Sequence, residues 1–150
     1  MKEIEIKSVF RVYGMNELSA EDRQLVEAAM EATKGSYAAR LANGVVFTGA
    51  NQENAAYPSG LCAERTTLFA ANAQYPDQPV LALAIAARKG NRFLQAPISP
   101  CGACRQVISG VEDRFNHPVR ILLYGTEGVY ECSGIDALLP LRFVDADMRL

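Results

Sequence analysis

The sequence predicts an α/β fold in which a mixed sheet is flanked by helices. Strand-like and helix-like segments alternate along the chain, as they do in layered α/β folds. Residues 80–87, VLALAIAA, form a nearly continuous apolar run of strand length, as expected for a strand buried on both faces. The 150 residues are 49% apolar and 21% charged, which fits one globular domain over 1–150.

The first helix has the clearest local signals. It opens at Ser19, with Asp22 three residues on in a capping-box-like spacing, continues with apolar residues at helical intervals, and ends at Gly35. Three further helical segments are expected over 62–72 after a Pro-Ser-Gly turn, over 101–115, and over 135–139 before Pro140.

The remaining segments favour strands. Residues 45–48 follow the turn pair Asn43-Gly44 and are rich in β-branched and aromatic side chains. Residues 4–13 have a weaker extended pattern. Two later strands are expected over 119–124 and 129–132.

Charge and composition exclude several classes of protein. A net charge of -2 and a pI of about 5.4 give no basic footprint for a nucleic-acid partner. No apolar run approaches the roughly 20 residues that span a bilayer, and the start, MKEIEIK, lacks the apolar region of a secretory signal. We therefore expect a cytoplasmic protein without a membrane partner, in which clustered thiols favour metal binding or catalysis over disulfides.

Two cysteine-containing segments, Cys62-Ala63-Glu64 and Pro100-Cys101-Gly102-Ala103-Cys104, carry the candidate chemistry. Each lies where a helix is expected to begin, and the free N–H groups and dipole of a helix N-terminus favour thiolates. Cys101 and Cys104 are three residues apart and share one face of a first turn. Three thiolates suit Zn²⁺, and three protein ligands leave a position for water, as in catalytic zinc sites.

Glu64 lies two residues after the first of these cysteines. Zinc lowers the pKa of a bound water toward ~7, so that hydroxide forms at neutral pH. A carboxylate beside the metal would take the proton from this water and pass it to a ring nitrogen and then to a leaving amine. This arrangement requires Cys62 near the helix cap. CAE followed by PCxxC matches the zinc-deaminase signature in its three-cysteine form.

The segments NQENAAYPSGLCAERTTLF and SPCGACRQVI resemble the small homotetrameric zinc-dependent cytidine deaminases, and the similarity extends to LLPLRF near the C-terminus. The resemblance implies a three-layer sandwich with a mixed five-stranded sheet. It also implies one zinc ion per subunit, a small nucleoside substrate and a role in pyrimidine salvage. The implied reaction is hydrolysis of cytidine or deoxycytidine to uridine or deoxyuridine and ammonia.

The resemblance also assigns roles to single residues. It implies that Cys62, Cys101 and Cys104 bind zinc and that Glu64 moves the proton. It implies that Asn51 and Glu53 bind the ribose and that the N–H of Ala63 holds the base carbonyl. It also implies that Phe143 of a neighbouring subunit covers the substrate, and that Arg65 and Gln106 surround the sulfurs. Three thiolates and one Zn²⁺ sum to a charge of -1, which an arginine donating to the sulfurs would offset.

One stretch departs from the family pattern. Family members carry a segment like PYSxFxVGAA after the first helix, whereas here residues 37–41 run almost directly into Asn43-Gly44. The difference amounts to about one strand and a turn, including a pocket aromatic. Losing an inner strand would leave a large apolar gap. The stretch is either truly deleted or omitted from the sequence. Because of the gap, we expect an omission, so that the intact mass exceeds 16.3 kDa.

Three other functions are compatible with parts of the pattern. A structural zinc module would need Cys132 or His117 as a fourth ligand, but we expect Cys132 in the core and His117 in a surface loop. A deaminase acting on nucleic acid would need a basic groove and stacking aromatics. A deaminase of a cytosine-containing antibiotic would share the motif.

Overall fold

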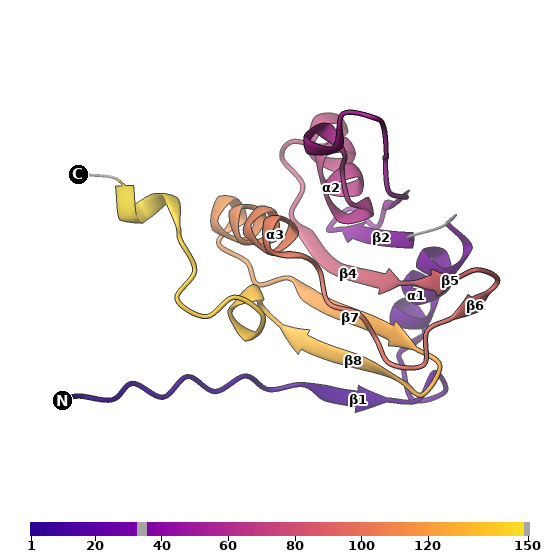
Figure 1. Ribbon diagram of the computed structural model, residues 1–150, viewed down its shortest axis with the longest axis horizontal. Coiled ribbons are helices and arrows are strands. Elements are labelled where there is room, and N and C mark those ends of the chain that lie inside the picture. The colour runs from indigo at the N-terminus through magenta and orange to yellow at the C-terminus, as the bar shows by residue number, and fades with distance from the viewer. Residues whose placement is uncertain (33–35, 149–150) are drawn as a thin grey trace.

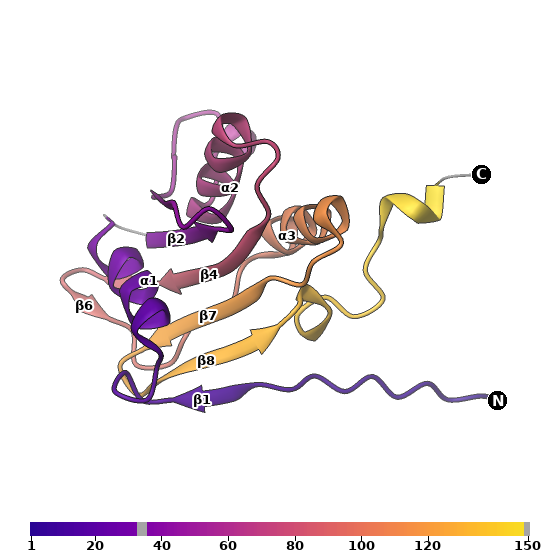
Figure 2. The same ribbon diagram turned by 180° about the vertical axis from the view of Figure 1, so that it is seen from behind.

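The computed structural model describes residues 1–32 and 36–148 and contains a six-stranded mixed sheet between two layers of helices (Figures 1 and 2). The strand order is β1-β8-β7-β4-β2-β3, in which β4 and β7 are parallel and the other neighbours antiparallel. The predicted α/β sandwich is confirmed, with six strands in the sheet instead of five. The strands are β1 (Arg11–Tyr13), β2 (Ser36–Leu41), β3 (Val46–Gly49), β4 (Val80–Ala86), β7 (Arg120–Gly125) and β8 (Gly128–Ser133), and a separate hairpin pairs β5 (Arg88–Lys89) with β6 (Arg92–Phe93).

The three helices lie close to their predicted positions. They are α1 (Ala20–Glu31), α2 (Ala63–Gln74) and α3 (Gly102–Phe115). Ser19 caps α1 as predicted, because its side chain accepts a hydrogen bond from the Asp22 N–H at 3.1 Å. The predicted end at Gly35 lies outside the described residues. Three short 3₁₀ turns are η1 (Tyr57–Ser59), η2 (Ile135–Ala137) and η3 (Asp145–Met148).

β4 is buried on both faces, as its apolar run predicted. Its alanines, Ala82, Ala84 and Ala86, belong to the cluster under α1, together with Leu25 and Val26 of that helix. Small side chains on this face let α1 approach the sheet closely. The alternate residues Leu83 and Ile85 belong to the second cluster, which lies between the sheet and the pair α2 and α3.

β2 corrects the expectation of a missing inner strand. It lies between β3 and β4, and Ala39 pairs with Phe47 on one side and Leu83 on the other. Tyr37, Ala38, Ala39 and Leu41 are fully buried and fill both faces of the sheet at this position. The predicted apolar gap is therefore absent from this part of the sheet, and the packing reason for an omitted stretch disappears with it.

Three smaller expectations also need correction. Of the extended segment 4–13, only Arg11–Tyr13 forms a strand, because residues 1–10 lie beyond the edge of the sheet (Figure 1). The helix expected over 135–139 is the single turn η2. The β5–β6 hairpin was not predicted. No helix in the described part of the chain is long and apolar enough to cross a membrane.

The strand directions determine where two helices begin. β2 is antiparallel to both β3 and β4, so β3 and β4 point the same way and end at the same edge of the sheet. The chain enters α2 after β3, and it enters α3 after β4 and the hairpin. The N-termini of α2 and α3 therefore meet at this one edge, on the same face of the sheet (Figure 1).

A buried carboxylate fastens α3 to the two segments that follow it. Glu112, on the inner side of α3, accepts hydrogen bonds from the N–H groups of Val119 at 2.8 Å and Ile135 at 3.0 Å. Burial raises the pKa of Glu112, and the two backbone bonds only partly oppose that rise. Glu112 thus satisfies two buried donors while keeping a charge in the interior.

Replacing Glu112 tests both sides of this balance. Glu112→Ala should lower the free energy of unfolding by about 2–4 kcal/mol, because two buried N–H groups lose their acceptor. Glu112→Gln keeps an acceptor oxygen. The pKa of Glu112 is higher in the folded parent than in the unfolded chain. Between these two pKa values the folded parent binds more protons, so its free energy of unfolding falls as pH rises.

Urea unfolding of the three proteins between pH 4 and 8 measures these effects. The stability of Glu112→Gln relative to the parent should rise with pH. A difference that does not change with pH would contradict the raised pKa, and an alanine variant as stable as the parent would contradict the role of the two bonds.

Candidate metal centre

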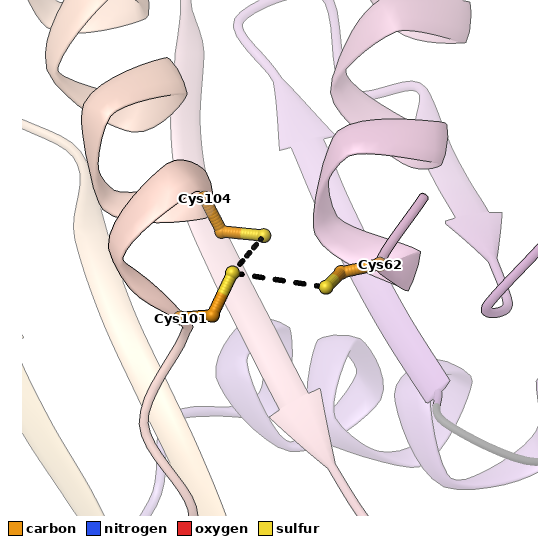
Figure 3. Close-up of side chains that lie close together, drawn as sticks. All are labelled: Cys62, Cys101 and Cys104. Carbon is orange, nitrogen blue, oxygen red and sulfur yellow. Dashed lines mark hydrogen bonds between the residues drawn. The ribbon is translucent and has the colours of Figure 1, made fainter. Parts of the chain in front are cut away.

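Three thiols meet where the two helices begin (Figure 3). Cys62 is the N-cap residue of α2, Cys101 is the N-cap residue of α3, and Cys104 lies in the first turn of α3. The Cys62 and Cys101 sulfurs are 3.7 Å apart, the Cys101 and Cys104 sulfurs are 3.3 Å apart, and all three lie within 4.8 Å of one another. Zn–S bonds of about 2.3 Å in a tetrahedron place sulfurs about 3.8 Å apart. The donor set therefore fits zinc.

The environments of these thiols differ. Burial raises the pKa of Cys101, but backbone N–H groups at the start of α3 and the neighbouring thiols outweigh burial and bring it below the usual value. Cys104 is fully buried, and burial raises its pKa well above the usual range. Cys101 thus gives up its proton more readily than Cys104, whose buried thiol needs a positive partner to do so.

Arg65 lies beside the sulfurs on α2. One of its terminal nitrogens donates to the carbonyl of Gly60 at 3.3 Å, whereas its Nε is buried and has no hydrogen-bond partner. The nearby Cys62 sulfur, acting as an acceptor, is the main cause of a raised pKa for Arg65. A buried N–H donor without a partner next to three sulfurs is suited to a site that becomes negatively charged when it binds metal.

Glu64, the second residue of α2, is buried at the same site. Burial raises the pKa of its carboxyl, while a bond from its own backbone N–H and another from the Cys104 thiol lower it. Side chains two residues apart within a helix point to different faces, but Cys62 is the N-cap residue and lies before the first turn. Because Cys62 precedes the helix, its side chain and that of Glu64 reach the same cavity.

That cavity has a volume of about 170 Å³. Cys62, Cys101 and Glu64 line it, together with the end of β4 and with Ile98 and Ser99. None of the described residues that line the cavity is aromatic. The pocket aromatic that the family resemblance implies therefore has no counterpart among them.

Asn51 also lines the cavity, and its side chain occupies the start of α2. Its Oδ1 accepts a hydrogen bond from the Ala63 N–H at 2.9 Å. The structure thus brings the predicted substrate-binding groups of Asn51 and Ala63 together, and in this structure they hydrogen-bond to each other. Glu53 lies on the exposed loop 53–60, near Gly60, and is not part of the cavity wall.

Gln106 and Phe143 lie elsewhere in this chain. The Gln106 amide donates to the carbonyl of Phe143 at 2.8 Å. The Phe143 side chain is 57% exposed, on a C-terminal segment that extends away from the sheet (Figure 1). Neither residue lines the cavity, so contact of Gln106 with the sulfurs and of Phe143 with a substrate remain predictions.

Arg105 is a positioning residue that the sequence analysis missed. Its Nε donates to the carbonyl of Pro100 at 2.8 Å, and a terminal nitrogen donates to that of Leu138 at 2.6 Å. These bonds hold the loop before Cys101 and tie it to the C-terminal segment. The one available signal was its position directly after the CxxC pair.

Cys132 is buried in the core and His117 is exposed in a loop, as predicted. Neither belongs to the three-thiol cluster. Within the described ranges 1–32 and 36–148, the cluster therefore lacks the fourth protein ligand that a closed structural zinc site requires.

Residues 13–115 match the family model described as the cytidine and deoxycytidylate deaminase zinc-binding region. The match covers more than half of the chain and includes all three clustered cysteines. The chain belongs to this family. The zinc-dependent deaminase class and the zinc cofactor expected from the cysteine motif are thereby confirmed.

Relatives and solved structures agree. A cytidine deaminase of Halalkalibacterium halodurans is 34% identical over 139 residues, covering 85% of this chain and 98% of the relative. A cytidine deaminase of Sporosarcina psychrophila is 38% identical over 106 residues, 71% of each chain. The crystal structure of a Burkholderia pseudomallei cytidine deaminase is 34% identical, with a TM-score of 0.65 over 80% of this chain and 97% of that one.

Metal analysis tests the deaminase site directly. The purified protein should bind one zinc ion per chain. Replacing Cys62, Cys101 or Cys104 by Ser should weaken zinc binding by more than the roughly 10–100-fold lost when a residue contacting a ligand is removed. Chelator competition measures the affinity. Cys132→Ser and His117→Ala serve as controls and should bind zinc like the parent; loss of zinc from either would identify a fourth ligand and contradict an open site.

Proposed function

We propose that this deaminase hydrolyses the exocyclic C–N bond of free cytidine or deoxycytidine and releases uridine or deoxyuridine and ammonia. The observation that carries the proposal is the three-thiol cluster beside a buried carboxylate in one small cavity. The names of the relatives, all cytidine deaminases, support the same substrate.

In the proposed reaction, the oxygen of water bonds to C4 of the base and the bond from C4 to the amino nitrogen breaks. Zinc held by Cys62, Cys101 and Cys104 would supply a Lewis acid that lowers the pKa of water. Arg65, next to the sulfurs, would offset the excess negative charge of three thiolates.

Glu64 would carry the protons. It takes one proton from water and delivers it to N3 of the base. It then takes the remaining proton from the oxygen on C4 and delivers it to the amino nitrogen, so that ammonia leaves as the C4 carbonyl forms. A carboxyl whose pKa is raised by burial suits this alternation, because it holds a proton more readily than an exposed glutamate does.

Asn51, Glu53 and Ala63 would bind the nucleoside. Asn51 lines the cavity and engages the Ala63 N–H, so a substrate carbonyl would bind that N–H by displacing the Asn51 side chain and freeing it for the ribose. Glu53 lies on the loop that follows Asn51, where it would meet the ribose outside the cavity.

A free nucleoside suits this site better than a nucleic acid. The cavity is about 170 Å³, and the described part of its wall offers no aromatic platform on which neighbouring bases would stack. The chain is also acidic overall. A polynucleotide would gain little from such a surface.

Glu64→Gln tests the proposed chemistry. The amide has nearly the shape of the acid but carries no transferable proton, so turnover of cytidine should fall at least about 10²–10⁴-fold while zinc content stays unchanged. Loss of the cytosine absorbance measures turnover, and Glu127→Gln in an exposed turn should behave like the parent. A Glu64→Gln variant that retains activity would overturn the mechanism.

The parent enzyme should also be assayed with deoxycytidine, a cytosine oligonucleotide and a cytosine-containing antibiotic. Turnover of the oligonucleotide or the antibiotic in preference to both nucleosides would overturn the proposed substrate.

We propose a homotetramer in which Phe143 of one subunit covers the substrate of another. The exposed side chain on an extended C-terminal segment supports this role. Light scattering should give four times the chain mass. Phe143→Ala should raise the KM for cytidine without loss of zinc, because an aromatic contact to the substrate is removed.

Leu141→Ala, at a more exposed position on the same segment, is the control and should keep the parent KM. A monomer in solution would exclude the role of Phe143 in a neighbouring site.

A further inference from the structure

Tyr37 is a buried phenol for which the proposed reaction has no use. It lies in β2, opposite Ile85 of the cavity wall on one side and Gly49 of β3 on the other. Its side chain is fully buried and belongs to the cluster between the sheet and α2, with Ala63.

The layer above Gly49 is tightly closed. A Cβ at Gly49 would collide with the hydroxyl of Thr67 and come within 3.3 Å of the Ala63 carbonyl, so α2 begins almost in contact with β3. The ring of Tyr37 therefore lies under the first turns of α2, the part of that helix that carries Cys62 and Glu64.

The hydroxyl of Tyr37 has no hydrogen-bond partner. Among the residues that the structure describes, only two buried side-chain nitrogen or oxygen atoms lack one, namely Tyr37 Oη and Arg65 Nε. Buried polar groups are almost always paired, so each exception calls for a physical reason. Here both exceptions are donors, and the charge of Cys104 acts on both residues.

Electrostatics links the phenol to the cluster. Besides burial, the charges of Glu64 and Cys104 raise the pKa of Tyr37, which keeps the hydroxyl protonated and able to donate. Burial raises the pKa of Cys104, and a protonated thiol is a poor acceptor. Metal binding removes its proton, and the resulting buried thiolate needs donors.

We propose that Tyr37 is a positioning residue of the zinc site, whose hydroxyl donates a hydrogen bond to the Cys104 thiolate when the metal is bound. The proposal rests on the zinc site inferred above but not on the identity of the substrate. It gives the buried Tyr37 hydroxyl, which has no hydrogen-bond partner within the chain, an acceptor at the zinc site.

Tyr37→Phe separates this role from simple packing. Without zinc, the variant should melt about 2–4 °C above the parent, because it removes an unpaired buried hydroxyl and keeps the ring. With zinc, chelator competition should show affinity weakened by about 10–100-fold. In the cobalt-substituted protein, the thiolate-to-metal charge-transfer band should move to longer wavelength, because the sulfur loses a donor that lowers the energy of its lone pairs.

Tyr124→Phe is the matched control, since Tyr124 packs edge-on against Phe93 beside the other cluster. Its zinc affinity and cobalt spectrum should match those of the parent. Unchanged zinc affinity and an unchanged cobalt band in Tyr37→Phe would overturn the proposal, and so would a lower melting temperature, or failure to fold, of the zinc-free variant.

None of these readouts requires turnover. A parent that binds zinc and shows the expected Tyr37→Phe effects without deaminating cytidine would support the role of Tyr37 and overturn only the proposed function. A parent that binds no zinc would overturn both.

Discussion

The site depends on one constraint, the convergence of two helix N-termini at a single edge of the sheet. Cys62 is the N-cap residue of α2 and Cys101 that of α3, so both residues lie at helix starts, where free N–H groups favour negative charge. The convergence follows from β3 and β4 pointing the same way, which requires β2 between them. The family resemblance suggested that an inner strand was missing. β2 occupies that position and gives β3 and β4 the same direction, which brings the two helix starts together.

A cluster of thiolates inside a protein also needs positive charge and donors around it. Arg65 supplies charge next to Cys62, and α3 supplies backbone N–H groups to Cys101. Close packing supports the same site. Gly49 lets α2 lie against β3, and Glu64 and Asn51 line one cavity. The packing of α2 on the sheet thus also determines which charged and polar groups surround the thiols.

The C-terminal third of the chain holds this arrangement from outside. Arg105 ties the loop before Cys101 to the segment after η2, and Glu112 anchors the starts of β7 and η2. Arg142 adds bonds to Asp136 at 2.7 Å and to Asp113 and Ser109 of α3. These are long-range contacts between polar residues that carry no periodic pattern, which is why sequence reasoning found none of them.

Sequence alone determined the elements with strong local signals and the chemistry of the motif. The apolar run of β4, the cap at Ser19 and the cysteine spacing each encode their structure within a few residues, so the sandwich and the cluster of three thiols were predictable. Tertiary structure decided the rest. Residues 36–41 form a strand only because β3 and β4 pair with them on both sides, and the pairing of Asn51 with Ala63 and the unpaired hydroxyl of Tyr37 exist only because segments far apart in the chain are packed together.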